Sequence, residues 1–63
     1  MKETLRMKIE QELRKIEERI TQLNEYIEEY VKRDNFSDAA LCKIKRDTLN
    51  MVADNLSNIL NNY

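Results

Sequence analysis

Seven large apolar residues recur at heptad spacing through the first half of the chain. Successive members are separated by four, three, four, three, four and three residues. This spacing is typical of a narrow apolar seam on one side of a long α-helix that packs against another helix. Charged and polar residues fill the positions between them, which predicts a solvated outer surface. The seven are Ile9, Leu13, Ile16, Ile20, Leu23, Ile27 and Tyr30.

The composition agrees with long helices. The chain contains no glycine and no proline, and 37% of its residues are charged. The two residues that most often interrupt helices are therefore absent. We expect a first helix over residues 2–33, where Glu29 and Arg33 form a pair with the stabilising order on the helix surface.

Residues 34–36 are the one predicted break. The charge pattern stops there, and Asn35 is a good N-cap for a second helix. Asp38 can return a bond to the backbone N–H of Asn35, as in a capping box, although Asp34 or Ser37 could cap instead. So short a connection implies antiparallel helices. One unbroken helix of about 60 residues is the alternative, disfavoured because the seam does not continue in phase through the break.

The second helix is expected over residues 36–62 with an apolar face about 180° wide, more than one partner helix covers. We therefore expect self-association. The candidate interface between subunits is Ile44, Leu49, Met51, Val52, Leu56 and Ile59. The whole face is Leu41, Cys42, Leu49, Val52, Leu56, Ile59, Leu60 and Tyr63, flanked by Ala40, Ile44 and Met51.

The predicted fold class is thus all-α: a single domain over residues 1–63, folded as a two-helix antiparallel hairpin. A chain of 63 residues is marginal as an independent domain. Two helices bury one stripe each, so we expect a homodimer in the form of a four-helix bundle, or a higher homo-oligomer.

The chain lacks residue types that several kinds of catalytic and ligand-binding site require. The chain has no histidine, which excludes Ser-His-Asp and Cys-His catalysis and His-ligated metal sites. Without glycine there is no phosphate-cradling loop of the Walker or Rossmann type. The carboxylates of the first helix lie off the seam and are interpreted as solvated. We therefore expect no enzyme activity, no cofactor and no metal.

Charge and hydropathy limit the partners. The net charge of −1 creates no overall field that would attract nucleic acid or an anionic membrane. No apolar run approaches the length of a membrane span or resembles a signal peptide. The single cysteine cannot form an internal disulfide. These features favour a cytoplasmic protein that does not bind membranes.

Two residues of the second helix have more than one interpretation. Lys45 falls within the apolar face; it is interpreted as a structural lysine that fixes the register of the helices. Alternatively, Lys45, Arg46 and Arg14 are candidate contacts for an anion. Cys42 is interpreted as a small packed hydrophobe, with an intersubunit disulfide or a reactive thiol as the alternatives.

Two resemblances bear on function, although we assign the chain to no family. The segment Phe36-Ser37-Asp38-Ala39-Ala40, followed by Lys43 and Leu49, resembles the UVR motif of excision-repair proteins. That motif is a helical hairpin, and the resemblance implies docking to another protein. The chain departs from it at Lys43-Ile44, where the family has Arg-Asp. The layout also resembles Rop-type plasmid regulators, whose two-helix chains dimerise into an RNA-binding bundle.

The function expected from the sequence is that of a small, non-enzymatic regulatory or adaptor protein. It would act through helix-mediated contacts with another protein whose identity the residues do not specify. One alternative is a Rop-like bundle that binds RNA or DNA through basic residues gathered across subunits. The other is an oligomer that sequesters a small anionic ligand.

Overall fold

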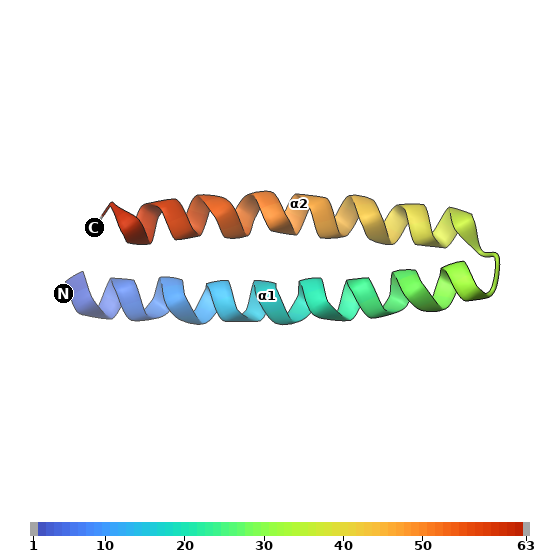
Figure 1. Cartoon of the computed structure of the whole chain (residues 1–63). Helices are drawn as coiled ribbons and strands as arrows, with labels where there is room; N and C mark the ends of the chain where they lie inside the picture. The colour runs from blue at the N-terminus through green and yellow to red at the C-terminus, as the bar shows by residue number, and fades with distance from the viewer. Residues whose placement is uncertain (1, 63) are drawn as a thin grey trace.

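The chain folds as two long helices that lie side by side. The computed structural model describes residues 2–62, and the side chains of residues 4–62. Helix α1 spans Lys2–Lys32 and helix α2 spans Phe36–Asn61. The helices run antiparallel, so the start of α1 and the end of α2 lie at the same end of the molecule (Figure 1). The all-α hairpin predicted from the sequence is confirmed, and the unbroken helix is excluded.

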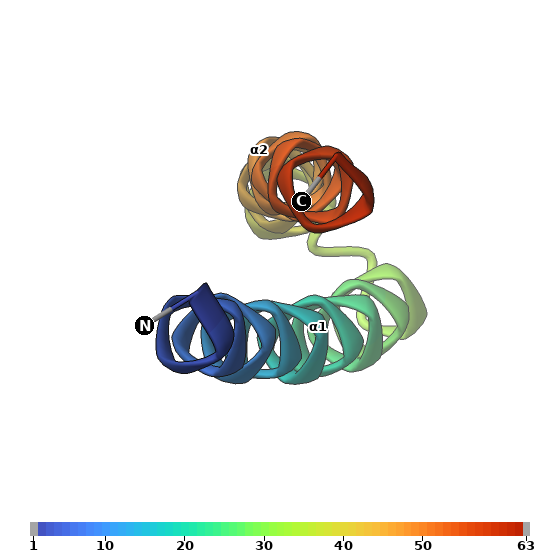
Figure 2. The ribbon, with the colours of Figure 1, turned by 90° about the vertical axis from the view of Figure 1, so that its left-hand side faces the viewer.

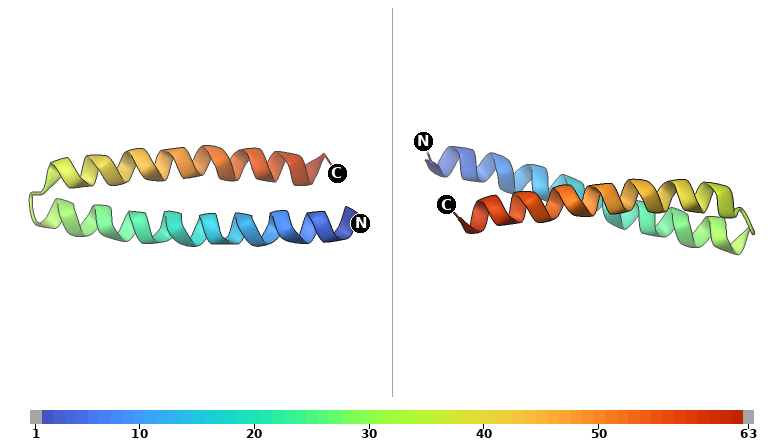
Figure 3. Two further views of the ribbon diagram at one scale, coloured as in Figure 1. Left: turned by 180° about the vertical axis from the view of Figure 1, so that it is seen from behind. Right: turned by 90° about the horizontal axis from the view of Figure 1, so that it is seen from above.

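The two helices form a thin rod. Its principal extents are 49 × 14 × 12 Å. Viewed from the end and from above, the helices cross at a shallow angle (Figures 2 and 3). All seven seam residues of α1 are buried or half-buried, whereas most other described side chains of this helix are exposed. The apolar seam of α1 is therefore the side that packs on α2.

Backbone hydrogen bonds close the end of α1. The N–H of Asn35 donates to the carbonyl oxygen of Tyr30 (2.8 Å), and the N–H of Asp34 donates to that of Val31 (3.1 Å). This pair of bonds is the Schellman arrangement, which satisfies carbonyls left free at a helix end. It requires a left-handed residue, and Asp34 takes that role with φ of 58°. Glycine is the usual residue there because it has no Cβ.

Asn35 also begins α2, as the sequence predicts. Its side-chain oxygen accepts a hydrogen bond from the N–H of Asp38 (3.4 Å). The return bond differs from the expected capping box. The Asp38 carboxylate accepts from the side-chain amide of Asn35 (2.7 Å), because the backbone N–H of Asn35 already donates to Tyr30. One residue thus ends the first helix and caps the second.

Only part of the apolar face expected for α2 packs on α1. The structure leaves Leu41, Val52 and Ile59 of that face exposed, and Val52 and Ile59 are among the residues predicted to lie between subunits. Tyr63 lies outside the described residues. The side chains that are buried or half-buried along α2 repeat at heptad spacing and include two alanines and an arginine. They are Ala39, Cys42, Arg46, Leu49, Ala53, Leu56 and Leu60, with Ser57 beside them.

Only a small core results. Among the described side chains, Leu23, Ile27 and Ala39 alone are buried. The accessible surface is 5132 Å², whereas a compact monomer of 7.6 kDa exposes about 4,300 Å². The hairpin therefore leaves about 800 Å² more surface in water than a compact chain of its mass.

Candidate interaction surface

Most of the exposed apolar residues of the molecule lie on α2. Ten large hydrophobic residues are exposed among the described side chains, and six of them belong to the shorter helix. Five of these six lie on one side of α2 between positions 41 and 59; we call them the outer α2 face. The outer α2 face consists of Leu41, Ile44, Met51, Val52 and Ile59.

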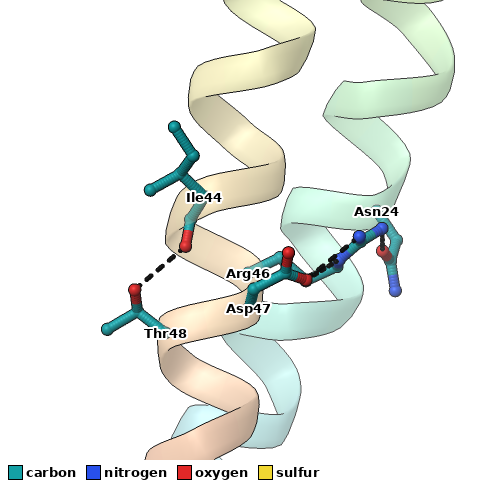
Figure 4. Close-up of polar contacts among 5 residues, drawn as sticks. All are labelled: Asn24, Ile44, Arg46, Asp47 and Thr48. Atoms are coloured by element: carbon teal, nitrogen blue, oxygen red, sulfur yellow. Dashed lines mark hydrogen bonds and ion pairs between the residues drawn. The ribbon is translucent and has the colours of Figure 1, made fainter.

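The helical period explains why these residues point outward. Each residue is rotated about 100° from the one before it. Ile44 precedes Arg46 by two residues and so lies about 200° from it around the axis. In the close-up, Arg46 reaches toward α1 while Ile44 points the opposite way (Figure 4). Ile44 and Met51 are 63% and 68% exposed, the two highest values among the large hydrophobic residues.

The outer α2 face contains little polarity. Thr48 and Asn55 lie between its apolar residues, and neither carries a charge. The Thr48 hydroxyl donates to the carbonyl oxygen of Ile44 (3.0 Å), which satisfies this donor within the helix (Figure 4). Lys45 is the charged side chain at its edge. An uncharged surface of this kind loses little on transfer out of water, because few polar groups need new partners.

Helix α1 presents a different surface. Its exposed large hydrophobic residues, Leu5, Met7, Tyr26 and Val31, are scattered along its length. Ion pairs cover much of the rest. They join Arg6 to Glu10 (3.2 Å), Lys15 to Glu12 (3.3 Å) and Arg33 to Glu29 (3.1 Å), all exposed and within the helix. We expect such pairs to remain hydrated.

The predicted intersubunit residues divide between two sides of α2. Ile44, Met51, Val52 and Ile59 lie on the outer face and are exposed. Leu49 and Leu56 are half-buried at inner heptad positions. These two leucines therefore contribute first to packing within the hairpin, and the exposed four carry the candidate surface.

The predicted anion contacts are not brought together. Arg46 is half-buried and donates to Asp47 in its own helix (3.1 Å) and to Asn24 of α1 (3.2 Å). Arg14 is exposed on α1, ten residues from Asn24, which is about 15 Å along the helix axis. Lys45 is exposed as well. No pocket was found among the described residues.

Lys45 does not have the internal position that its sequence context suggests. It lies on the exposed side of α2, and no ion pair or side-chain hydrogen bond to it is found among the described residues. Arg46, one position later, is the basic residue at an inner position. Arg46, and not Lys45, therefore forms the polar contact found between α1 and α2 in the described part of the chain. Cys42 is half-buried at an inner heptad position, which agrees with its interpretation as a packed hydrophobe.

Sequence reasoning missed the inner positions Ala39, Arg46 and Ala53. The signal was present, because these residues continue a three-and-four spacing with Cys42 and Leu49. This spacing is hard to recognise in the sequence, because larger apolar residues lie beside it and dominate the hydropathy pattern of the helix.

Within the described part of the chain, no three His, Cys, Asp or Glu side chains lie close enough together to hold a metal ion. No described helix is long and apolar enough to cross a membrane. No model of a known protein family matches the chain, and no match was found among curated proteins or solved structures. The similarities to the UVR motif and to Rop-type regulators remain predictions from the sequence.

Proposed function

We propose that this chain is a non-enzymatic regulatory or adaptor protein that binds other protein chains through helix faces. The outer α2 face is its contact surface. The observation that carries the proposal is the concentration of exposed, uncharged apolar side chains on one side of α2. Large exposed apolar residues that gather on one side of an element mark interaction sites in small proteins.

The energetic balance of the hairpin supports a partner. With three buried side chains in the described part of the chain, the core is small against the entropy cost of ordering the helices. Burial of apolar surface contributes about 25 cal/mol per Å². A partner that covered the outer α2 face would add a second apolar contact to the one between the helices.

The arrangement of basic residues favours a protein partner over nucleic acid. Nucleic-acid binding needs several basic side chains that converge on phosphates. Arg6, Lys15, Arg33 and Arg46 each form an ion pair with a carboxylate nearby in the sequence. The outer α2 face itself carries no basic side chain except Lys45 at its edge.

A pair of matched lysine substitutions tests the proposal. Ile44→Lys places a charge on the outer α2 face, and Met7→Lys places one at a similarly exposed site of α1, since the two residues are 63% and 58% exposed. Tagged versions of both variants and of the wild type are used for affinity purification from the native host. Circular dichroism confirms that each remains helical.

We expect the wild type and Met7→Lys to retain the same bound protein and Ile44→Lys to lose it. A charge buried without a partner at an interface costs several kcal/mol, so the expected loss is at least about 30-fold in affinity. Equal recovery with all three proteins would contradict the proposal, as would co-purified nucleic acid that is released by salt.

A further inference from the structure

Three residues of the outer α2 face, Leu41, Val52 and Ile59, belong to a second regular spacing along the helix. Starting at Leu41, positions along this side of α2 recur after four, three, four, three and four residues. This is a second heptad seam, rotated from the one that packs on α1. Its six positions are Leu41, Lys45, Thr48, Val52, Asn55 and Ile59.

The second seam is symmetric about position 50. Leu41 and Ile59 lie nine residues from that position on either side, Lys45 and Asn55 five, and Thr48 and Val52 two. Rotation by 180° about an axis through this point therefore superimposes the seam on itself. Leu41 then meets Ile59, and Lys45 meets Asn55, with which it can form a polar contact. Thr48 meets the apolar residue Val52.

Resting on the proposed function, we propose that the outer α2 face binds a second copy of this chain, through an antiparallel α2–α2 contact around a two-fold axis near position 50. In this contact Leu41 packs against the partner's Ile59, and Lys45 lies opposite the partner's Asn55. The interface is isologous, so each of these contacts occurs twice.

The hairpin as a whole exposes about 800 Å² more than a compact monomer of its mass. This surplus is spread over both helices, and a second hairpin on the outer α2 face would cover part of it. Ile44 and Met51 each precede a seam position by one residue, so they widen the contact along one edge, with Met51 next to the two-fold axis.

Charge favours the antiparallel direction over the parallel one. A parallel contact in register would place Lys45 against the partner's Lys45, with two like charges at an apolar interface. The antiparallel contact separates the two lysines and offers each ammonium the side-chain oxygen of the partner's Asn55. Antiparallel α2 helices also align their dipoles favourably.

This arrangement makes α2 the central element of the assembly. Each α2 would contact its own α1 on one side and the partner's α2 on another, while the ion-paired surface of each α1 stays in water. It differs from a bundle in which all four helices contribute equally, because the residues of α1 next to the hairpin seam include Glu12 and Arg19, both exposed and charged.

Cysteine cross-linking tests both the occupant and the register. Leu41→Cys and Ile59→Cys are made separately in a Cys42→Ala background, mixed, and oxidised under mild conditions. Both sites are exposed in the hairpin, and circular dichroism verifies that the variants remain helical. Met7→Cys, exposed on α1, is the control for random collision.

We expect the disulfide between Leu41→Cys and Ile59→Cys to exceed either same-residue disulfide several-fold, and Met7→Cys to remain uncross-linked. Dominant 41–41 and 59–59 products would show a parallel contact and overturn the inference. Cross-linking at the level of the Met7→Cys control would also overturn it.

The two proposals can fail separately. If the mixed disulfide is absent but Ile44→Lys still abolishes capture of a different protein, the second copy is wrong and the proposed function stands. If the mixed disulfide is absent and Ile44→Lys has no effect on any contact, both proposals are wrong.

Discussion

Arg46 of α2 donates a hydrogen bond to the side-chain oxygen of Asn24 of α1, with 3.2 Å between nitrogen and oxygen. It is the one side-chain hydrogen bond found between the two helices in the described part of the chain. The Arg46 side chain is 29% exposed, so the bond forms at the border of the packed side. Because the bond joins fixed positions on antiparallel helices, it favours one register over a shift by one turn.

A double-mutant cycle with Arg46→Met and Asn24→Ala measures this bond. We expect a coupling free energy of about 0.5–1.5 kcal/mol in denaturant unfolding at fixed protein concentration. Asn24 carries no charge, so the coupling should persist at high salt. The exposed pair Arg33 and Glu29 is the control; its coupling should be about 0.5 kcal/mol or less and should be lost in salt. A zero coupling between Arg46 and Asn24 would contradict the role given to this bond.

The backbone conformation of Asp34 predicts opposite effects for two small substitutions. Asp34→Gly removes the Cβ from a left-handed residue and should stabilise the hairpin by about 0.5–1 kcal/mol. Asp34→Ala keeps a Cβ and loses the polar side chain that tolerates this region, so it should destabilise by a similar amount. Thermal unfolding followed by circular dichroism separates the two. Equal stabilities would mean that the Schellman turn does not limit stability.

Leu23 and Leu41 should respond differently to the same truncation. Leu23 is 2% exposed and Leu41 is 57% exposed. Leu23→Ala should lower the free energy of unfolding by about 2–4 kcal/mol, because it leaves a cavity between the helices. Leu41→Ala should leave the helical content intact and weaken self-association instead. Unfolding curves and sedimentation of both variants check this division, which a larger loss of helix in Leu41→Ala would contradict.

Lys45→Met tests what the exposed lysine does. Within the hairpin Lys45 has no partner in the described residues, so helix formation should not suffer from the substitution. In the α2–α2 contact it replaces a charged seam residue by an apolar one, and self-association should become several-fold tighter. The substitution should also make the antiparallel direction of the α2–α2 contact less specific, because the contact between Lys45 and the partner's Asn55 is lost. Weaker association, measured by sedimentation, would show that Lys45 contributes net attraction.

The sequence predicts α1 well and the packing of α2 poorly, for a physical reason. On α1 the large apolar residues and the seam coincide, so hydropathy identifies the side that packs. On α2 large apolar residues lie on two sides of the helix, and the exposed residues Leu41 and Val52 are as apolar as the half-buried Leu49. Hydropathy alone cannot separate these surfaces.

Small side chains mark the side of α2 that faces α1. Ala39, next to the short turn, is 3% exposed, and a side chain of this size lets two helices pack closely. Arg46 and Ala53 lie on the same side, at inner positions. The residues of the candidate surface could thus be found from the sequence, but its division from the packing side required the structure.

The molar mass of the purified protein tests the central claim most directly. Static light scattering is recorded from low micromolar to millimolar concentration for the wild type and for Ile44→Lys. We predict that the wild type reaches twice the 7.6 kDa of one chain and that Ile44→Lys stays at the mass of one chain while remaining helical. A wild type that stays at 7.6 kDa over the whole range, with an unfolding temperature independent of concentration, would contradict the claim.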